Sequence, residues 1–62
     1  MNANELEIGG QYNWVGQPER LIYRGPMRDS SGLWHQFALV EKPWKVWCEV
    51  RTSDLERFEV SK

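Results

Sequence analysis

The hydrophobic positions of this chain fall into short segments separated by turn-forming residues. The segments are rich in aromatic and β-branched side chains, which are typical of strands rather than helices. No long stretch combines a helical period with the absence of Gly and Pro. The turn signals are Gly9-Gly10, Gly16–Pro18, Gly25-Pro26, Asp29–Gly32 and Lys42-Pro43. The pattern therefore predicts an all-β fold.

We predict five strands and one short helical turn. The strands are expected over Gln11–Val15, Arg20–Arg24, Leu33–Val40, Lys45–Arg51 and Arg57–Val60. The helical turn lies around Leu55, before the last strand, where Ser53 or Asp54 could cap it. An open edge on so small a sheet promotes aggregation, so we expect a closed five-stranded antiparallel barrel. Residues 1–7 are expected to form a polar N-terminal tail and residues 8–62 a single domain.

The alternation of side chains along a strand predicts which residues face the core. If residues 41–44 form the turn between the third and fourth strands, the apolar pairs share one face. These inward pairs are His35–Val50, Phe37–Cys48 and Leu39–Val46. Pairing Arg24 with Trp34 then places Tyr23 beside His35 and Leu21 beside Phe37, again inward.

The opposite face is predicted to be aromatic and basic. One row across the strands would read Arg24, Trp34 and Arg51, with an indole between two guanidinium groups. Cation–π contact at such an exposed position contributes roughly 0.5–1 kcal/mol. A second row would read Arg20, Ala38 and Trp47, while Gln36 and Glu49 lie between the two rows.

The order of these elements resembles the Src-homology-3-like small barrels, which include Tudor-type and KOW-type domains. The resemblance covers roughly residues 8–60 and depends most on Val46–Val50 followed by Asp54–Phe58. In Tudor-type domains an aromatic cage binds methylated side chains. The resemblance implies that the cage walls here would be Tyr12, Trp14 and Trp44, with Glu41 as the carboxylate. The short first loop departs from the long acidic loop of proline-motif-binding members.

Composition narrows the functional classes. The chain has 62 residues and a net charge of −1, which disfavours a strongly basic nucleic-acid-binding domain. Cys48 is the only cysteine and His35 the only histidine, so an internal disulfide and a zinc site are not expected. No metal or cofactor is predicted. Because no apolar run could span a membrane or serve as a signal-peptide core, we expect a cytoplasmic protein. The style of the sequence also resembles small proteins encoded by phages and prophages.

Residues with catalytic potential are more simply explained by structural roles. His35 is expected to be a hydrogen-bonded core histidine, and Cys48, between Val46 and Val50, a buried thiol. Asp54 and Glu56 are expected to cap or solvate the helical turn. No nucleophile, base and acid come together in the pattern, so we predict that the protein is not an enzyme.

The tryptophans point to a binding surface, because exposed aromatic side chains beside arginines mark partner sites. We predict a protein-binding module with a contact surface made of Arg20, Arg24, Trp34, Gln36, Trp44, Trp47 and Arg51. Two alternatives use the same face. One is single-stranded nucleic-acid binding, with bases stacked on the indoles. The other is homodimerisation, which would supply burial that a small core lacks.

Overall fold

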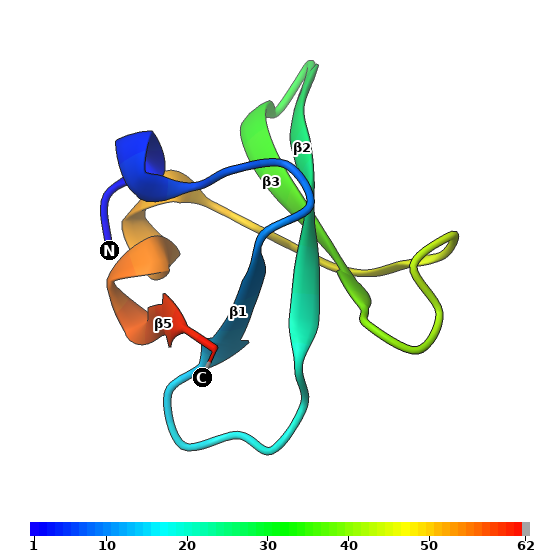
Figure 1. Ribbon diagram of the computed structural model, residues 1–62. Coiled ribbons are helices and arrows are strands. Elements are labelled where there is room, and N and C mark those ends of the chain that lie inside the picture. Colours follow the sequence, from blue (N-terminus) through cyan, green and yellow to red (C-terminus); the bar gives the residue numbers. More distant parts are fainter. Residues whose placement is uncertain (62) are drawn as a thin grey trace.

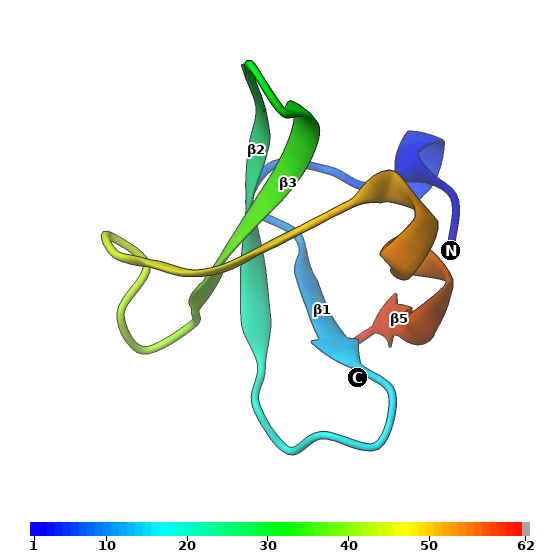
Figure 2. The ribbon, with the colours of Figure 1, turned by 180° about the vertical axis from the view of Figure 1, so that it is seen from behind.

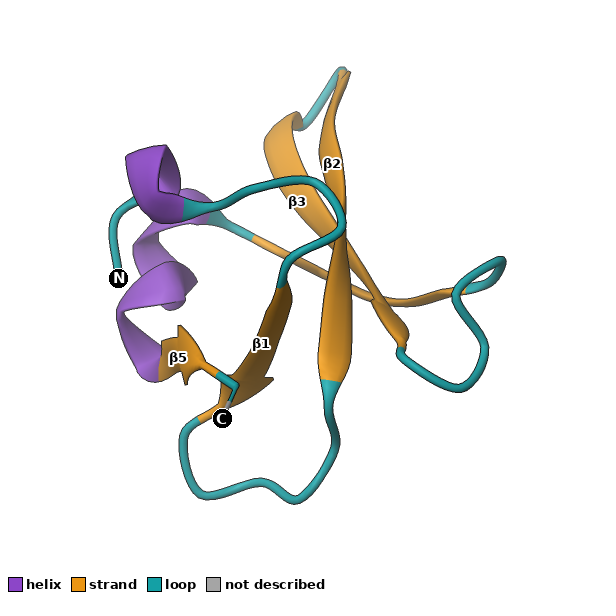
Figure 3. Ribbon diagram, viewed as in Figure 1, coloured by secondary structure: helices purple, strands orange, loops and turns teal. Residues whose placement is uncertain are grey.

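The computed structural model describes residues 1–61 and contains a single antiparallel sheet (Figure 1; Figure 3). The elements in chain order are η1 (Ala3–Glu5), β1 (Gln11–Trp14), β2 (Leu21–Asp29), β3 (Gly32–Leu39), β4 (Val46–Val50), η2 (Thr52–Arg57) and β5 (Phe58–Val60). Five strands and a helical turn before the last strand are thus confirmed. The turn, η2, is a 3-10 helix whose N-cap is Arg51, with no side-chain cap, so the predicted cap at Ser53 or Asp54 is wrong.

The predicted closure of the sheet is not observed. The strand order is β4-β3-β2-β1-β5, and no strand ladder among the described residues joins β4 to β5. The chain passes from β4 to β5 through η2, and within residues 1–61 the short strand β5 pairs with β1 alone. In Figure 2, η2 leads directly into β5, which lies beside β1. The outer edge of β4 is therefore left without a strand partner.

Strand β2 continues through Gly25-Pro26, which the turn signals had predicted to end it. Its register against β3 shifts between Tyr23 and Gly25, and Gly25 has a φ of +115°. The shift leaves Arg24 without a partner in the β3 ladder. Pro26 is tolerated because β1 pairs only with the start of β2, so the missing N–H interrupts no second ladder.

The β3–β4 register matches the prediction over three pairs and then changes. His35 lies opposite Val50, Gln36 opposite Glu49 and Phe37 opposite Cys48, as expected. The next pair is Ala38–Val46, so Trp47 is an additional residue in β4 and makes a bulge. The predicted pairs of Leu39 with Val46 and Ala38 with Trp47 are wrong. The β2–β3 register also differs by two residues, since Tyr23 lies opposite Phe37 and Leu21 opposite Leu39.

The inward-facing residues form an aromatic core, as the alternation predicted, but Val46, which was also expected inward, is 43% exposed because the bulge at Trp47 changes its face. Phe37 is central: its ring stacks on Phe58 at 4.7 Å and meets Tyr12 edge-on at 6.4 Å. Leu55 is fully buried and anchors η2 against the sheet. The buried cluster comprises Tyr12, Leu21, Tyr23, Phe37, Val50, Leu55 and Phe58.

The N-terminal segment is packed against this core, although we expected a polar tail. Met1, Ala3 and Leu6 are partly buried against the core cluster. The Tyr12 hydroxyl accepts a hydrogen bond from the Glu7 amide at 2.9 Å and donates to the Glu5 carbonyl at 3.3 Å. Each apolar side chain in this segment adds buried area that a small domain needs.

The described residues include no helix with the length and hydropathy of a membrane span.

Candidate functional site

The Trp34 indole is already engaged within the chain. The Arg51 guanidinium lies 4.0 Å from the ring centroid, as the predicted row required. Arg51 also donates from Nη1 to the Ser31 carbonyl at 2.9 Å, and the indole N–H donates to the Ser31 hydroxyl at 3.0 Å. Arg24 is not part of this stack, because the register places Trp34 opposite Met27. Trp34 therefore stabilises the β2–β3 turn and offers little free surface.

The same turn holds a carboxylate. The Asp29 side chain accepts hydrogen bonds from the Ser31 hydroxyl at 2.6 Å and the Ser31 amide at 2.8 Å. These bonds, together with one from the Trp34 indole, lower the pKa of Asp29 below its usual range. The indole N–H of Trp34 donates to the Asp29 carboxylate at 3.3 Å, in addition to its bond with Ser31.

The remaining predicted contact residues are not arranged in one row. The Gln36 amide donates to Glu49 at 2.9 Å across β3 and β4, and to the Met27 sulfur at 3.2 Å. Ala38 is completely buried and lies between Ile22 and Val46, so the predicted row of Arg20, Ala38 and Trp47 is wrong.

The predicted aromatic cage is not assembled. Tyr12 is 4% exposed and forms part of the core, so its ring cannot line an open site. Trp44 is 74% exposed in the turn between β3 and β4, which projects from the sheet (Figures 1 and 2). Glu41 lines a different hollow, together with Pro18, Glu19, Arg20 and Val40. Trp14 packs edge-on against Phe58 at 4.8 Å and is partly buried.

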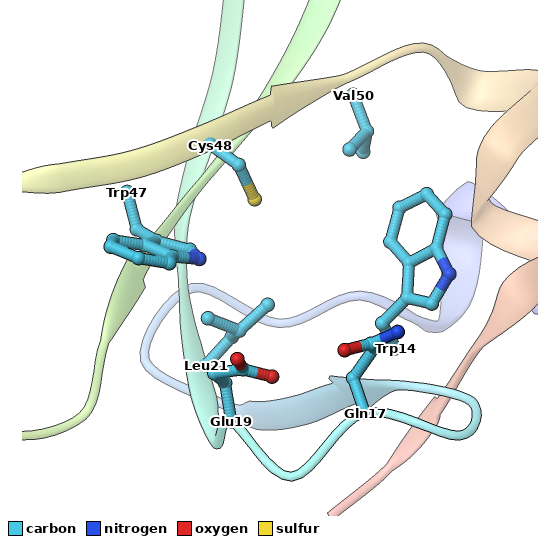
Figure 4. A pocket seen from close by; sticks show the side chains of 7 residues that line it. All are labelled: Trp14, Gln17, Glu19, Leu21, Trp47, Cys48 and Val50. Atoms are coloured by element: carbon cyan, nitrogen blue, oxygen red, sulfur yellow. The ribbon is translucent and has the colours of Figure 1, made fainter.

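A groove of about 330 Å³ lies between β4 and the loop that follows β1. Figure 4 shows Trp14 and Trp47 on opposite sides of this groove, with the Cys48 sulfur directed between them. Leu21 forms part of the floor. The lining residues are Trp14, Gln17, Glu19, Leu21, Trp47, Cys48 and Val50. We call this cavity the indole groove.

The bulge in β4 explains why Trp47 lines the groove. A regular strand would turn Trp47 and Cys48 to opposite faces. The extra residue between Val46 and Cys48 breaks that alternation, and Trp47 lies beside the same cavity as Cys48 and Val50. The Trp47 side chain is 57% exposed, so it remains available to a partner.

Glu19 gives the indole groove its charge. No lysine or arginine lines the groove within residues 1–61, and Glu19 is the one carboxylate among its lining residues. Burial, and secondarily the nearby Glu49, raises the pKa of the Cys48 thiol, so the thiol is neutral at pH 7. The groove is apolar with one negative charge on its rim.

The structure thus combines residues that our sequence analysis had assigned to separate groups. Trp47 came from the predicted partner face and Trp14 from the predicted cage. Gln17, Glu19 and Leu21 were not predicted as site residues. The loop from Gly16 to Arg20 was interpreted only as a turn, and no sequence signal pairs it with β4, which follows it by more than 25 residues.

The other residues with catalytic potential have structural roles. His35 is 3% exposed, and its two ring nitrogens bond to the hydroxyls of Tyr23 and Thr52, each at 2.9 Å. Burial lowers the pKa of His35. Asp54 lies in the first turn of η2, where its amide donates to the Arg51 carbonyl. Neither side chain lines the indole groove.

Comparisons with models of protein families, with curated proteins and with solved structures found no match to this chain.

Proposed function

We propose that this chain is a non-enzymatic protein-binding module whose indole groove takes a basic side chain from a partner peptide. One observation carries the proposal: two indoles stand on opposite sides of an open groove that has a carboxylate and no cation among its lining residues. A lysine or arginine side chain matches each of these features.

The physical fit has three parts. The aliphatic stem of a lysine or arginine can cover Leu21 and Val50, since such stems bury well along apolar surfaces. The cationic end can lie over the Trp14 or Trp47 ring, where contact contributes about 0.5–2 kcal/mol depending on desolvation. The Glu19 carboxylate then supplies a counter-charge. Few groups contribute, so we expect a dissociation constant on the order of 0.1–1 mM for a short peptide.

This proposal modifies the predicted contact surface. It retains Trp47 and adds Trp14 and Glu19. It leaves out Trp34 and Arg51, which stack on each other, and Gln36, which is hydrogen-bonded to Glu49. The strand order β4-β3-β2-β1-β5, with η2 before β5, supports the resemblance to Src-homology-3-like domains. Membership of that class, a cytoplasmic location and a phage or prophage origin remain parts of the proposal.

A displayed library of random heptapeptides tests the function. We expect sequences selected on the wild-type protein to be enriched in lysine or arginine and to lose binding to Trp47→Ala. Trp44→Ala is the matched control, because Trp44 is also an exposed indole but does not line the groove. Circular dichroism would verify that both variants fold. Selected peptides that bind Trp47→Ala as well as wild type would show that the groove is not the site.

Self-association is a second candidate that the open sheet supports. The outer strands β4 and β5 carry the exposed side chains of Val46, Trp47 and Val60. An edge strand with apolar side chains is a template for pairing with another chain. Light scattering would decide this by measuring the molar mass at protein concentrations from roughly 10 μM to 1 mM, the range in which weak dimers form. A constant monomer mass would exclude it.

A further inference from the structure

A second hollow lies next to the indole groove and shares Trp47 with it. It measures about 80 Å³ and is lined by Leu39, Lys42, Lys45, Val46 and Trp47. Among these described residues two are cationic and none is acidic. Trp47 therefore separates an acidic rim at Glu19 from a basic hollow at Lys42 and Lys45.

The backbone of the β3–β4 turn holds both lysines at this hollow. The Lys42 amide donates to the Leu39 carbonyl at 2.9 Å, and the Lys45 amide donates to the Lys42 carbonyl at 3.1 Å. These two consecutive bonds form a tight turn and fix where each lysine leaves the backbone. Glu41, the acid in the same turn, lines a different hollow and so leaves the charge of this one unbalanced.

We propose that the peptide bound in the indole groove also carries an acidic residue two positions from its basic residue, and that this acid binds at Lys42 and Lys45. The inference rests on the proposed function. In an extended peptide, residues two apart point to the same side and are separated by about 7 Å. A peptide with this spacing would present one charge on each side of Trp47, the residue that the two cavities share.

An isolated carboxylate suits this surface better than a polyanion does. Glu19 lines the adjoining indole groove, and Glu41 directly precedes Lys42 in the chain. The chain as a whole has a net charge of −1. Successive phosphates of a nucleic acid would meet these carboxylates as well as the lysines. One acidic side chain next to a basic one instead matches the alternation of charge across Trp47, and opposite charges set the register of a bound partner.

The test uses synthetic heptapeptides with a central lysine-alanine-glutamate or glutamate-alanine-lysine, each paired with a version that has glutamine for glutamate. Titrations are followed by the indole N–H signals in two-dimensional NMR at low salt. We expect one order to bind about two- to five-fold more tightly than its glutamine version, as is typical of an exposed ion pair. The shifts should appear at Trp14 and Trp47.

A double substitution, Lys42→Gln with Lys45→Gln, should abolish the preference for glutamate while leaving lysine-dependent binding intact. Arg24→Gln with Arg28→Gln is the charge-matched control, since both arginines are exposed on β2 and line neither cavity. Equal affinity of glutamate and glutamine peptides in both orders would overturn this inference and leave the proposed function standing. Absence of any shift at Trp14 and Trp47 would remove both. Stronger binding of an oligothymidylate than of any peptide, lost in the double variant, would instead assign the hollow to nucleic acid.

Discussion

The Tyr23 hydroxyl oxygen lies 2.9 Å from Nδ1 of His35 inside the core, and the opposite ring nitrogen lies 2.9 Å from the Thr52 hydroxyl. This chain of hydrogen bonds joins β2, β3 and η2 at one end of the sheet. A neutral imidazole has one donor and one acceptor nitrogen, so the two hydroxyls complement it. Burial lowers the pKa of His35. Burial, and to a smaller extent the electrostatic interaction with Tyr12, raises the pKa of Tyr23.

The lowered pKa of His35 predicts a loss of stability in mild acid. The unfolded chain protonates its histidine near pH 6.5, while the folded chain resists protonation. The contribution is therefore fully present above about pH 6.5 and is lost as pH falls toward the folded pKa. Urea unfolding from pH 8 to pH 5 should show this decline.

The His35→Gln variant provides the comparison, since glutamine does not titrate. We expect its free energy of unfolding to change less than that of wild type between pH 7 and pH 5. Parallel pH profiles for the two proteins would contradict the assigned pKa shift. The Asp29 carboxylate loses its contribution only at lower pH, because its pKa is lowered from an already acidic value.

Replacing Arg51 should weaken the β2–β3 turn. Arg51→Gln removes both the contact with the Trp34 ring and the hydrogen bond to the Ser31 carbonyl. We expect a loss of about 1–2 kcal/mol in the free energy of unfolding. Arg24→Gln is the matched control, because Arg24 is an exposed arginine at the register shift, and its effect should stay within about 0.5 kcal/mol. Equal effects would show that the Arg51 contacts contribute nothing.

Alanine substitutions at two glycines would distinguish the cost of backbone strain from the cost of steric contact. Both Gly16 and Gly25 have positive φ values, +85° and +115°. A Cβ at Gly16 would meet nothing, whereas one at Gly25 would lie 3.3 Å from Cδ1 of Ile8. We expect Gly16→Ala to cost about 1–2 kcal/mol from the left-handed backbone alone and Gly25→Ala to cost more. Chemical unfolding measures both, and a smaller effect at Gly25 would mean that its bulge relaxes.

The Cys48 thiol reports on the indole groove. Its raised pKa and its position between Trp14 and Trp47 predict alkylation by iodoacetamide several-fold slower than that of free cysteine at pH 7.5. Trp47→Ala should accelerate the reaction because it removes one wall, while Trp44→Ala should not. Mass spectrometry of the alkylated protein follows the rate. Equal rates in both variants would place Cys48 outside the influence of Trp47.

The core was predictable because a strand offers only two faces. Leu21, Tyr23, Phe37 and Val50 were expected inward from alternation alone, and all four are buried. An error of two residues in the β2–β3 register did not move any of them, since a shift of two preserves the face. The stacking of Arg51 on Trp34 was predicted for a similar reason, although the partner expected on the other side, Arg24, was wrong.

The amino-acid sequence by itself determined the number and order of the strands, most of the inward set and the helical turn before β5, because side-chain period and turn residues act locally. Only the tertiary structure decided the indole groove. Two bulges, at Arg24 and Trp47, depend on how neighbouring strands meet and leave no periodic signal. The open edge of β4, with Trp14 and Glu19 across from it, depends on contacts between segments far apart in the chain. Such contacts are selected by the packing of the whole core.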